Sequence, residues 1–92
     1  MILGFKCKHT QALFEGGHPK RFRAIKVVAT RKLTQLDSAM TLEFMRSPPG
    51  NRLEALRGNR AGQYSVRIND QWRLCFRWVD GHAEDVEIAD YH

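Results

Sequence analysis

The sequence has few of the features that mark metal, redox or membrane proteins. Its two cysteines, Cys7 and Cys75, lie far apart and belong to no CxxC pair, so neither a zinc motif nor a redox motif is present. No apolar run is long enough to span a bilayer, and the apolar start over residues 1–6 is too short for a signal peptide. We therefore expect a cytoplasmic protein with no metal, no cofactor and no membrane contact. In a reducing compartment the two thiols would be packing residues.

Acidic residues are also scarce over most of the chain. Residues 1–46 carry nine Lys or Arg against three acids, and residues 47–77 carry six Arg against two acids. Residues 78–92 carry five acids and no Lys or Arg, so the whole chain has a net charge of +5. Ten of the fifteen cations are arginines, which favour bidentate phosphate contacts. The charge favours a nucleic-acid partner over a merely soluble basic surface.

Hydrophobic spacing predicts an α+β fold in one domain spanning residues 1–92, with helices in the first half. The apolar start predicts a short strand, and a stripe with spacing of three and four predicts a long amphipathic helix that begins at Pro19. The expected elements are a strand over 2–6, a helix over 10–15 capped by Thr10, the long helix over 19–36, a single turn over 41–45 and a loop over 47–51.

After residue 51 the apolar period changes from about four to two, which predicts strands. The expected strands cover residues 52–57, 63–68, 72–78 and 85–92, mainly antiparallel and packed on the long helix. A three-residue connection over 69–71 places Ile68 beside Trp72 on the core face. The same register places Arg67 directly opposite Arg73, and like charges in that position destabilise a sheet. This arrangement indicates a ligand on the polar face.

The last hairpin has a similar expected geometry. Side-chain parity predicts a three-residue connection, Asp80–His82, because Phe76 then faces Val86. In this register Arg77 lies across from Asp85.

The polar face combines arginines with a terminal acid, phenol and imidazole. Arginines can hold a phosphate and offset the charge that grows on its oxygens, and Asp90, Tyr91 and His92 can bind or transfer protons. This combination suits metal-free cleavage of RNA through its 2′-hydroxyl. The residues alone favour equally a binding sheet, on which Tyr91 and His92 stack on bases. The predicted RNA-binding or ribosome-binding arginines are Arg57, Arg60, Arg67, Arg73 and Arg77.

Four segments together resemble the HigB toxins, the plasmid maintenance killer branch of the RelE/ParE superfamily. They are residues 51–62 (NRLEALRGNRAG), 65–67 (SVR), 69–76 (NDQWRLCF) and the closing Asp-Tyr-His. The resemblance covers nearly the whole chain and implies the microbial-RNase-like RelE fold. It further implies a type II toxin that cleaves translated mRNA in the A site of the 70S ribosome. A HigA-type helix-turn-helix antitoxin would hold it inactive.

The resemblance also assigns roles to individual residues. Asp90, Tyr91 and His92 fall on the family's catalytic group, and Arg73 falls on its sheet arginine. Some members have histidine where this chain has Glu54 and lysine where it has Arg57, so we include both residues as catalytic candidates. Arg57 keeps the charge but is a poor proton donor. Strand parity places Glu54 on the face opposite Arg57, and neighbouring arginines would favour its ionised form.

We expect His92 to carry most of the proton transfer, with Asp90 orienting it. The alternative within the superfamily is a ParE-like inhibitor that binds DNA gyrase and cleaves nothing. A plain RNA-binding module is a third possibility, although one tyrosine among arginines is fewer than the stacking aromatics such a platform needs. The basic outer face of the long helix is a candidate antitoxin contact, formed by Arg23, Lys26 and Arg31.

Overall fold

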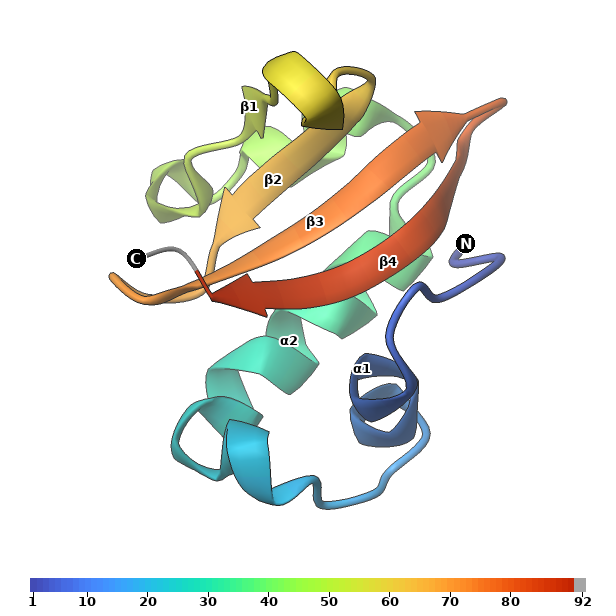
Figure 1. Cartoon of the computed structure of the whole chain (residues 1–92). Coiled ribbons are helices and arrows are strands. Elements are labelled where there is room, and N and C mark those ends of the chain that lie inside the picture. Colours follow the sequence, from blue (N-terminus) through green and yellow to red (C-terminus); the bar gives the residue numbers. More distant parts are fainter. Residues whose placement is uncertain (91–92) are drawn as a thin grey trace.

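A computed structural model describes residues 1–90 and shows a four-stranded antiparallel sheet with helices on one face (Figure 1). The predicted α+β order is confirmed. The helical elements are α1 (Lys8–Phe14), η1 (Lys20–Ile25), α2 (Lys26–Ser38), η2 (Leu42–Arg46), η3 (Pro49–Asn51) and η4 (Gly58–Arg60). The strands are β1 (Glu54–Ala55), β2 (Gln63–Arg67), β3 (Trp72–Val79) and β4 (His82–Asp90).

The N-terminal segment lies along the outer edge of β4 without forming a regular strand. It makes two isolated parallel bridges, Ile2 with Ala83 and Phe5 with Val86. The backbone N–H of Ile2 donates to Asp37 Oδ1 on α2 at 2.9 Å, so the segment is attached to both layers. The expected strand over residues 2–6 is therefore only partly formed, because the chain also bonds to α2 and turns at once into α1.

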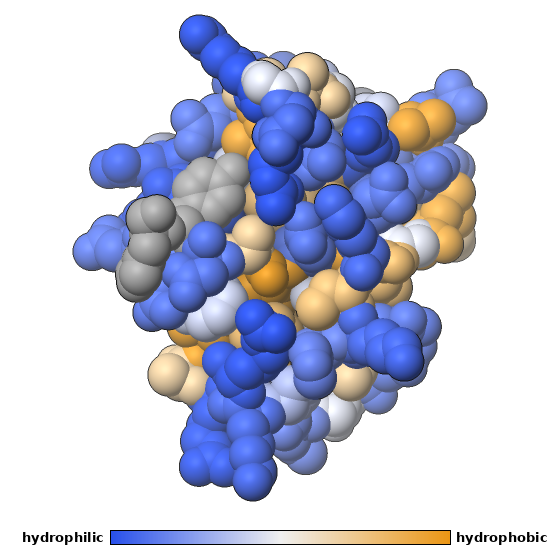
Figure 2. Space-filling view, viewed as in Figure 1, coloured by the Kyte–Doolittle hydropathy of each residue, from blue (hydrophilic) through white to orange (hydrophobic). Residues whose placement is uncertain are grey.

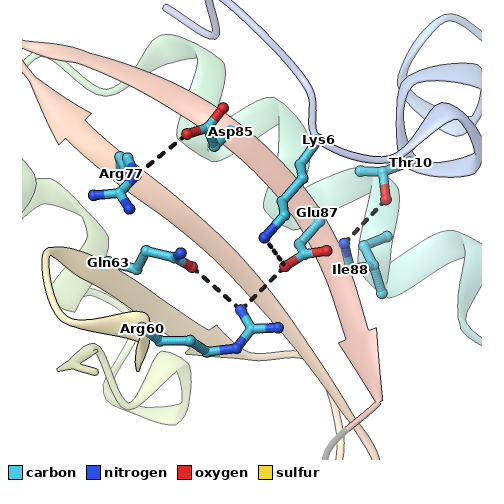
Figure 3. Close-up of polar contacts among 8 residues, drawn as sticks. All are labelled: Lys6, Thr10, Arg60, Gln63, Arg77, Asp85, Glu87 and Ile88. Atoms are coloured by element: carbon cyan, nitrogen blue, oxygen red, sulfur yellow. Dashed lines mark hydrogen bonds and ion pairs between the residues drawn. The ribbon is translucent and has the colours of Figure 1, made fainter. Parts of the chain in front are cut away.

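The first helix differs from its prediction at its start. It begins at Lys8 after Cys7, so the expected Thr10 cap is wrong. Thr10 is fully buried inside α1, and its Oγ1 accepts a hydrogen bond from the Ile88 backbone at 3.0 Å (Figure 3). Thr10 therefore joins α1 to β4, a tertiary role that its helix-capping preference did not indicate.

The predicted long helix over 19–36 is divided into η1 and α2. Ile25 leaves helical geometry, with φ −112° and ψ 6°, and α2 begins directly after it. The apolar stripe itself is confirmed, since its main members point into the core. The buried members are Phe22, Ile25, Ala29, Leu33 and Leu36.

The sheet register confirms the prediction for the central strands. Arg67 pairs with Arg73 across β2 and β3, and the opposite face packs on the helices. β1 is shorter than the expected strand over 52–57. Arg52 adopts a left-handed backbone with φ 47° and η4 begins at Gly58, so only two residues between them pair with β2.

The β3–β4 connection is not the predicted three-residue loop. Val79 pairs with His82, which leaves the two-residue turn Asp80-Gly81. Both turn residues have positive φ, 51° and 81°, as the common two-residue hairpin turn requires. β4 therefore begins three residues earlier than expected.

A bulge restores the expected faces beyond this turn. The pairing register shifts just before Arg77, and Asp85 has a positive φ of 51°. Arg77 consequently pairs with Glu84, not with Asp85 as predicted. Beyond the bulge, Arg73 lies opposite Ala89 as predicted.

Asn51 connects the proline loop to α2 from a fully buried position. Its Nδ2 donates to the Met45 carbonyl at 3.0 Å and to Gln35 Oε1 at 3.1 Å, and Lys32 Nζ donates to its Oδ1. The predicted loop over 47–51 thus ends in a single 3-10 turn that is fixed by one amide. This amide holds the chain where it enters β1.

The remaining predicted features concern the two cysteines and membrane-spanning helices. Cys75 is buried and Cys7 is half-buried, and neither cysteine belongs to a disulfide. No helix among residues 1–90 is both long and apolar enough to cross a membrane.

We expect Asn51→Ala to destabilise the protein, because it leaves a buried carbonyl and the Lys32 ammonium without their partner. The loss should be about 2 kcal/mol, which lowers Tm by roughly 10 °C for a chain of this size. Thermal unfolding followed by circular dichroism measures it, with the exposed Asn59→Ala as control. Equal Tm values for the two variants would contradict this role of Asn51.

Candidate active site

The polar face of the sheet, here called the arginine face, carries Arg67, Arg73 and Arg77. Figure 2 shows that hydrophilic side chains cover most of the visible side of the molecule, with apolar side chains in smaller areas between them. Although the arginine face lies away from the core, several of its small residues are buried beneath the long side chains. Ser65 and Cys75 are fully buried there, and Gln63 is 6% exposed.

Carboxylates accompany the arginines of this face. Arg67 Nη2 lies 2.5 Å from Asp70 Oδ1, and this hydrogen bond holds the pKa of Asp70 below its ordinary value. Arg73 Nη1 lies 3.9 Å from Glu54 Oε1. Because each member of the opposed pair Arg67 and Arg73 has an acid beside it, the repulsion between them is reduced.

Three further ion pairs involve β4, and one of them joins Lys6 Nζ to Glu87 Oε1 at 3.9 Å (Figure 3). Arg77 Nε lies 3.2 Å from Asp85 Oδ2, so these side chains form an ion pair although Asp85 is not the cross-strand partner of Arg77. Arg60 Nη1 donates to Glu87 Oε1 at 3.0 Å and to Gln63 Oε1 at 3.2 Å. The Glu87 side chain is only 16% exposed, so this pair fixes the η4 loop to the sheet.

Glu54 belongs to the arginine face. It pairs with Ser65 across β1 and β2, and its side chain is 57% exposed. A carboxylate that is open to solvent and lies beside Arg73 can accept a proton from a bound substrate. Arg57 is exposed in the connection between β1 and η4. The structure thus brings Glu54 next to Arg73 and leaves Arg57 at the edge of the sheet.

The three C-terminal candidates are only partly described. Asp90 lies at the exposed end of β4, opposite Trp72, and its Oδ2 accepts a hydrogen bond from Gln71 Nε2 at 3.1 Å. Tyr91 and His92 lie outside the described residues, so their predicted roles stay predictions.

One residue of the site, Glu87, was missed by sequence reasoning, whereas strand alternation placed Ser65 on the polar face. Alternation along β4 places Glu87 on the same face as Ala89, which is the arginine face. This alternation could have predicted the contact of Glu87 with Arg60. The burial of Ser65 was not predictable in this way, because a serine in an alternating strand is usually read as exposed.

A second set of cations lies on the helices η1 and α2. Its members are exposed or half-exposed, and within residues 1–90 none of them has a carboxylate oxygen within 4.0 Å. We call this set the basic helical surface; it comprises Lys20, Arg21, Arg23, Lys26 and Arg31.

A cavity of about 190 Å³ opens on the basic helical surface. It is lined by His18, Pro19, Arg23 and Lys26, and Lys26 Nζ contacts His18 Nδ1. Its lining is basic, so it suits an anion. In the described part of the chain, no three His, Cys, Asp or Glu side chains gather as metal ligands would.

Comparison with known proteins places these features in a family. The family model described as "RelE-like toxin of type II toxin-antitoxin system HigB" matches residues 3–92. The chain is 44% identical over 85 residues to "Toxin HigB-1" of Vibrio cholerae, covering 90% of each protein. It is 30% identical over 93 residues to "Endoribonuclease HigB" of Proteus vulgaris, covering all of both.

Solved structures show the same fold at lower sequence identity. The Staphylococcus aureus YoeB–YefM complex contains a chain with TM-score 0.58 and 20% identity, covering 100% of this chain and 98% of that one. The YoeB dimer of the same organism gives TM-score 0.56 at 20% identity, covering 99% and 97%. The predicted RelE-like architecture is confirmed by these similarities. By the family match and by both relatives, the chain belongs to the HigB family of RelE-like toxins of type II toxin–antitoxin systems.

Proposed function

We propose that the protein is an endoribonuclease that cleaves translated mRNA in the A site of the 70S ribosome. The observation that carries the proposal is the exposed Glu54 carboxylate, 3.9 Å from Arg73 on the arginine face. The full-length relative named an endoribonuclease supports the same reaction class. The family match does not favour the ParE-like gyrase inhibitor.

The reaction needs three contributions from the chain. The Arg73 guanidinium binds the scissile phosphate and stabilises the charge that develops on its non-bridging oxygens. Glu54 removes the proton from the 2′-hydroxyl, whose oxygen then forms a bond to phosphorus. The P–O5′ bond breaks, and His92, oriented by Asp90, protonates the leaving oxygen. The products are a 2′,3′-cyclic phosphate and a 5′-hydroxyl.

The ion pairs of the free protein divide the predicted RNA-binding arginines into two groups. The Arg73–Glu54 pair has a separation of 3.9 Å, and its Glu54 side chain is 57% exposed although the Arg73 side chain is only 18% exposed. A pair with one exposed member at this distance contributes little stability, so phosphate can replace Glu54 beside Arg73. Arg60 is held at 3.0 Å by the largely buried Glu87 and also by Gln63. Arg73 is therefore proposed as a substrate contact, whereas Arg60 mainly fixes the η4 loop.

The basic helical surface has two candidate partners, the HigA-type antitoxin predicted from the sequence and ribosomal RNA. When cations without carboxylate partners bind a phosphate backbone, counterions leave the nucleic acid. This release favours binding of the basic helical surface to a polyanion. We therefore propose that ribosomal RNA binds the basic helical surface and that the mRNA binds the arginine face.

Primer extension on a translated message tests the proposed activity. Expression of the wild-type protein should produce cuts within codons in frame, and His92→Ala should abolish them because the leaving oxygen loses its acid. His9→Ala, an exposed histidine on α1, is the matched control and should cut as the wild type does. Growth arrest with intact messages would point instead to gyrase.

Glu54→Gln should slow cleavage by about 100-fold or more, because an amide cannot accept the proton. Single-turnover rates on ribosomes programmed with a short message measure this change, and Tm should be unchanged because the side chain is 57% exposed. Glu43→Gln removes another exposed carboxylate, paired with Arg46 at 3.0 Å, and should have no effect on the rate. Wild-type rates for Glu54→Gln would exclude Glu54 as the base.

Replacing Arg23, Lys26 and Arg31 together by alanine should weaken ribosome binding. The slope of log K against log salt should fall by roughly two to three for three lost phosphate contacts. Binding to purified antitoxin is the control and should be retained. Loss of antitoxin binding with unchanged ribosome affinity would assign this surface to the antitoxin.

A further inference from the structure

Ser65 presents an unusual feature on the arginine face. It lies in the middle of β2, is 0% exposed, and its Oγ has no hydrogen-bond partner within the described residues. A buried hydroxyl without a partner costs stability, since it has lost water and gained nothing in return. Alanine would fill nearly the same volume without that cost. Packing alone therefore does not explain a serine here.

The cross-strand neighbours of Ser65 include Glu54, the proposed base. Glu54 lies directly opposite Ser65 on β1, and Cys75 lies directly opposite it on β3. Directly opposed side chains in antiparallel strands have Cβ atoms about 5 Å apart, which is within reach of a glutamate carboxylate. Arg73 is the diagonal neighbour, two residues from Cys75 on the same face.

In the proposed reaction, the Glu54 carboxylate loses its partner when the substrate binds. In the free protein it lies 3.9 Å from Arg73 and has no closer ion pair among residues 1–90. A phosphate that binds the Arg73 guanidinium takes that partner away. The Ser65 hydroxyl lies on the adjacent strand, directly opposite Glu54, and is a donor with no partner among residues 1–90.

We propose that Ser65 is a positioning residue for Glu54, whose hydroxyl donates to the Glu54 carboxylate once the RNA phosphate has taken Arg73. This hydrogen bond holds the carboxylate over the 2′-hydroxyl, and it exists only in the complex with RNA. The Ser65 hydroxyl has no partner among residues 1–90 of the free protein and acts as a donor in the bound state. The inference rests on the proposed nuclease function.

The test compares Ser65→Ala, Glu54→Gln and the double variant on programmed ribosomes, with thermal unfolding of each. Ser65→Ala should lower kcat by about 10- to 100-fold with little change in KM. The double variant should match Glu54→Gln within about threefold, because Ser65 acts through Glu54. Ser65→Thr keeps the hydroxyl and should retain most of kcat.

Thr30→Val supplies the matched control. Thr30 Oγ1 on α2 is also buried without a partner in the described residues, but it lies away from the arginine face. Both Thr30→Val and Ser65→Ala should keep or raise Tm, and only Ser65→Ala should lower kcat.

Each other outcome has one meaning. Wild-type kcat in Ser65→Ala, while the wild-type protein cuts, overturns the Ser65 proposal alone. Additive losses in the double variant, or a clear fall in Tm for Ser65→Ala, also overturn it, since Ser65 would act independently or structurally. A wild-type protein that makes no cut on ribosomes rejects the proposed function itself.

Discussion

The site depends on one electrostatic constraint, two arginines placed directly opposite each other on neighbouring strands. Arg67 and Arg73 face the same way because Val66 and Leu74 must face the core. Such a pair is tolerable only with negative charge nearby, and Asp70 and Glu54 supply it in the free protein. An RNA phosphate can supply it in the complex. In the proposed mechanism, the carboxylate that balances Arg73 before binding then acts as the base.

The remaining cations divide into those with a nearby carboxylate and those without one among residues 1–90. On the sheet, the Arg60–Glu87 and Arg77–Asp85 pairs attach loops and strands to one another and add local rigidity. On the helices, the cations of the basic helical surface have no such partners within residues 1–90. The acids of the last fifteen residues therefore neutralise the sheet and not the helices. This separates the arginine face, which we propose as the catalytic face, from the basic helical surface, which we propose as the contact with ribosomal RNA.

The sequence predicted the strand faces well, because period-two alternation with a buried side leaves only one choice of face. The opposition of Arg67 and Arg73 followed directly from it. Parity could not distinguish a three-residue hairpin loop from a two-residue turn followed by a bulge at Asp85, since both place the same residues inward. The contact between Glu54 and Arg73 was also beyond sequence reasoning, because a two-residue β1 carries no readable pattern. The role of the buried Thr10 was also missed, because it depends on a tertiary neighbour, the Ile88 backbone.

The most direct test of this account replaces a single hydroxyl of the substrate. A short message with a 2′-deoxynucleotide on the 5′ side of the scissile bond is placed in the A site of programmed ribosomes, and cleavage is compared with that of the all-ribose message. If the arginine face directs attack by the 2′-oxygen, the ribose message is cut to a 2′,3′-cyclic phosphate and the deoxy message stays intact at that position. Cleavage of both messages at the same bond would contradict the account, because the attacking oxygen would then come from water.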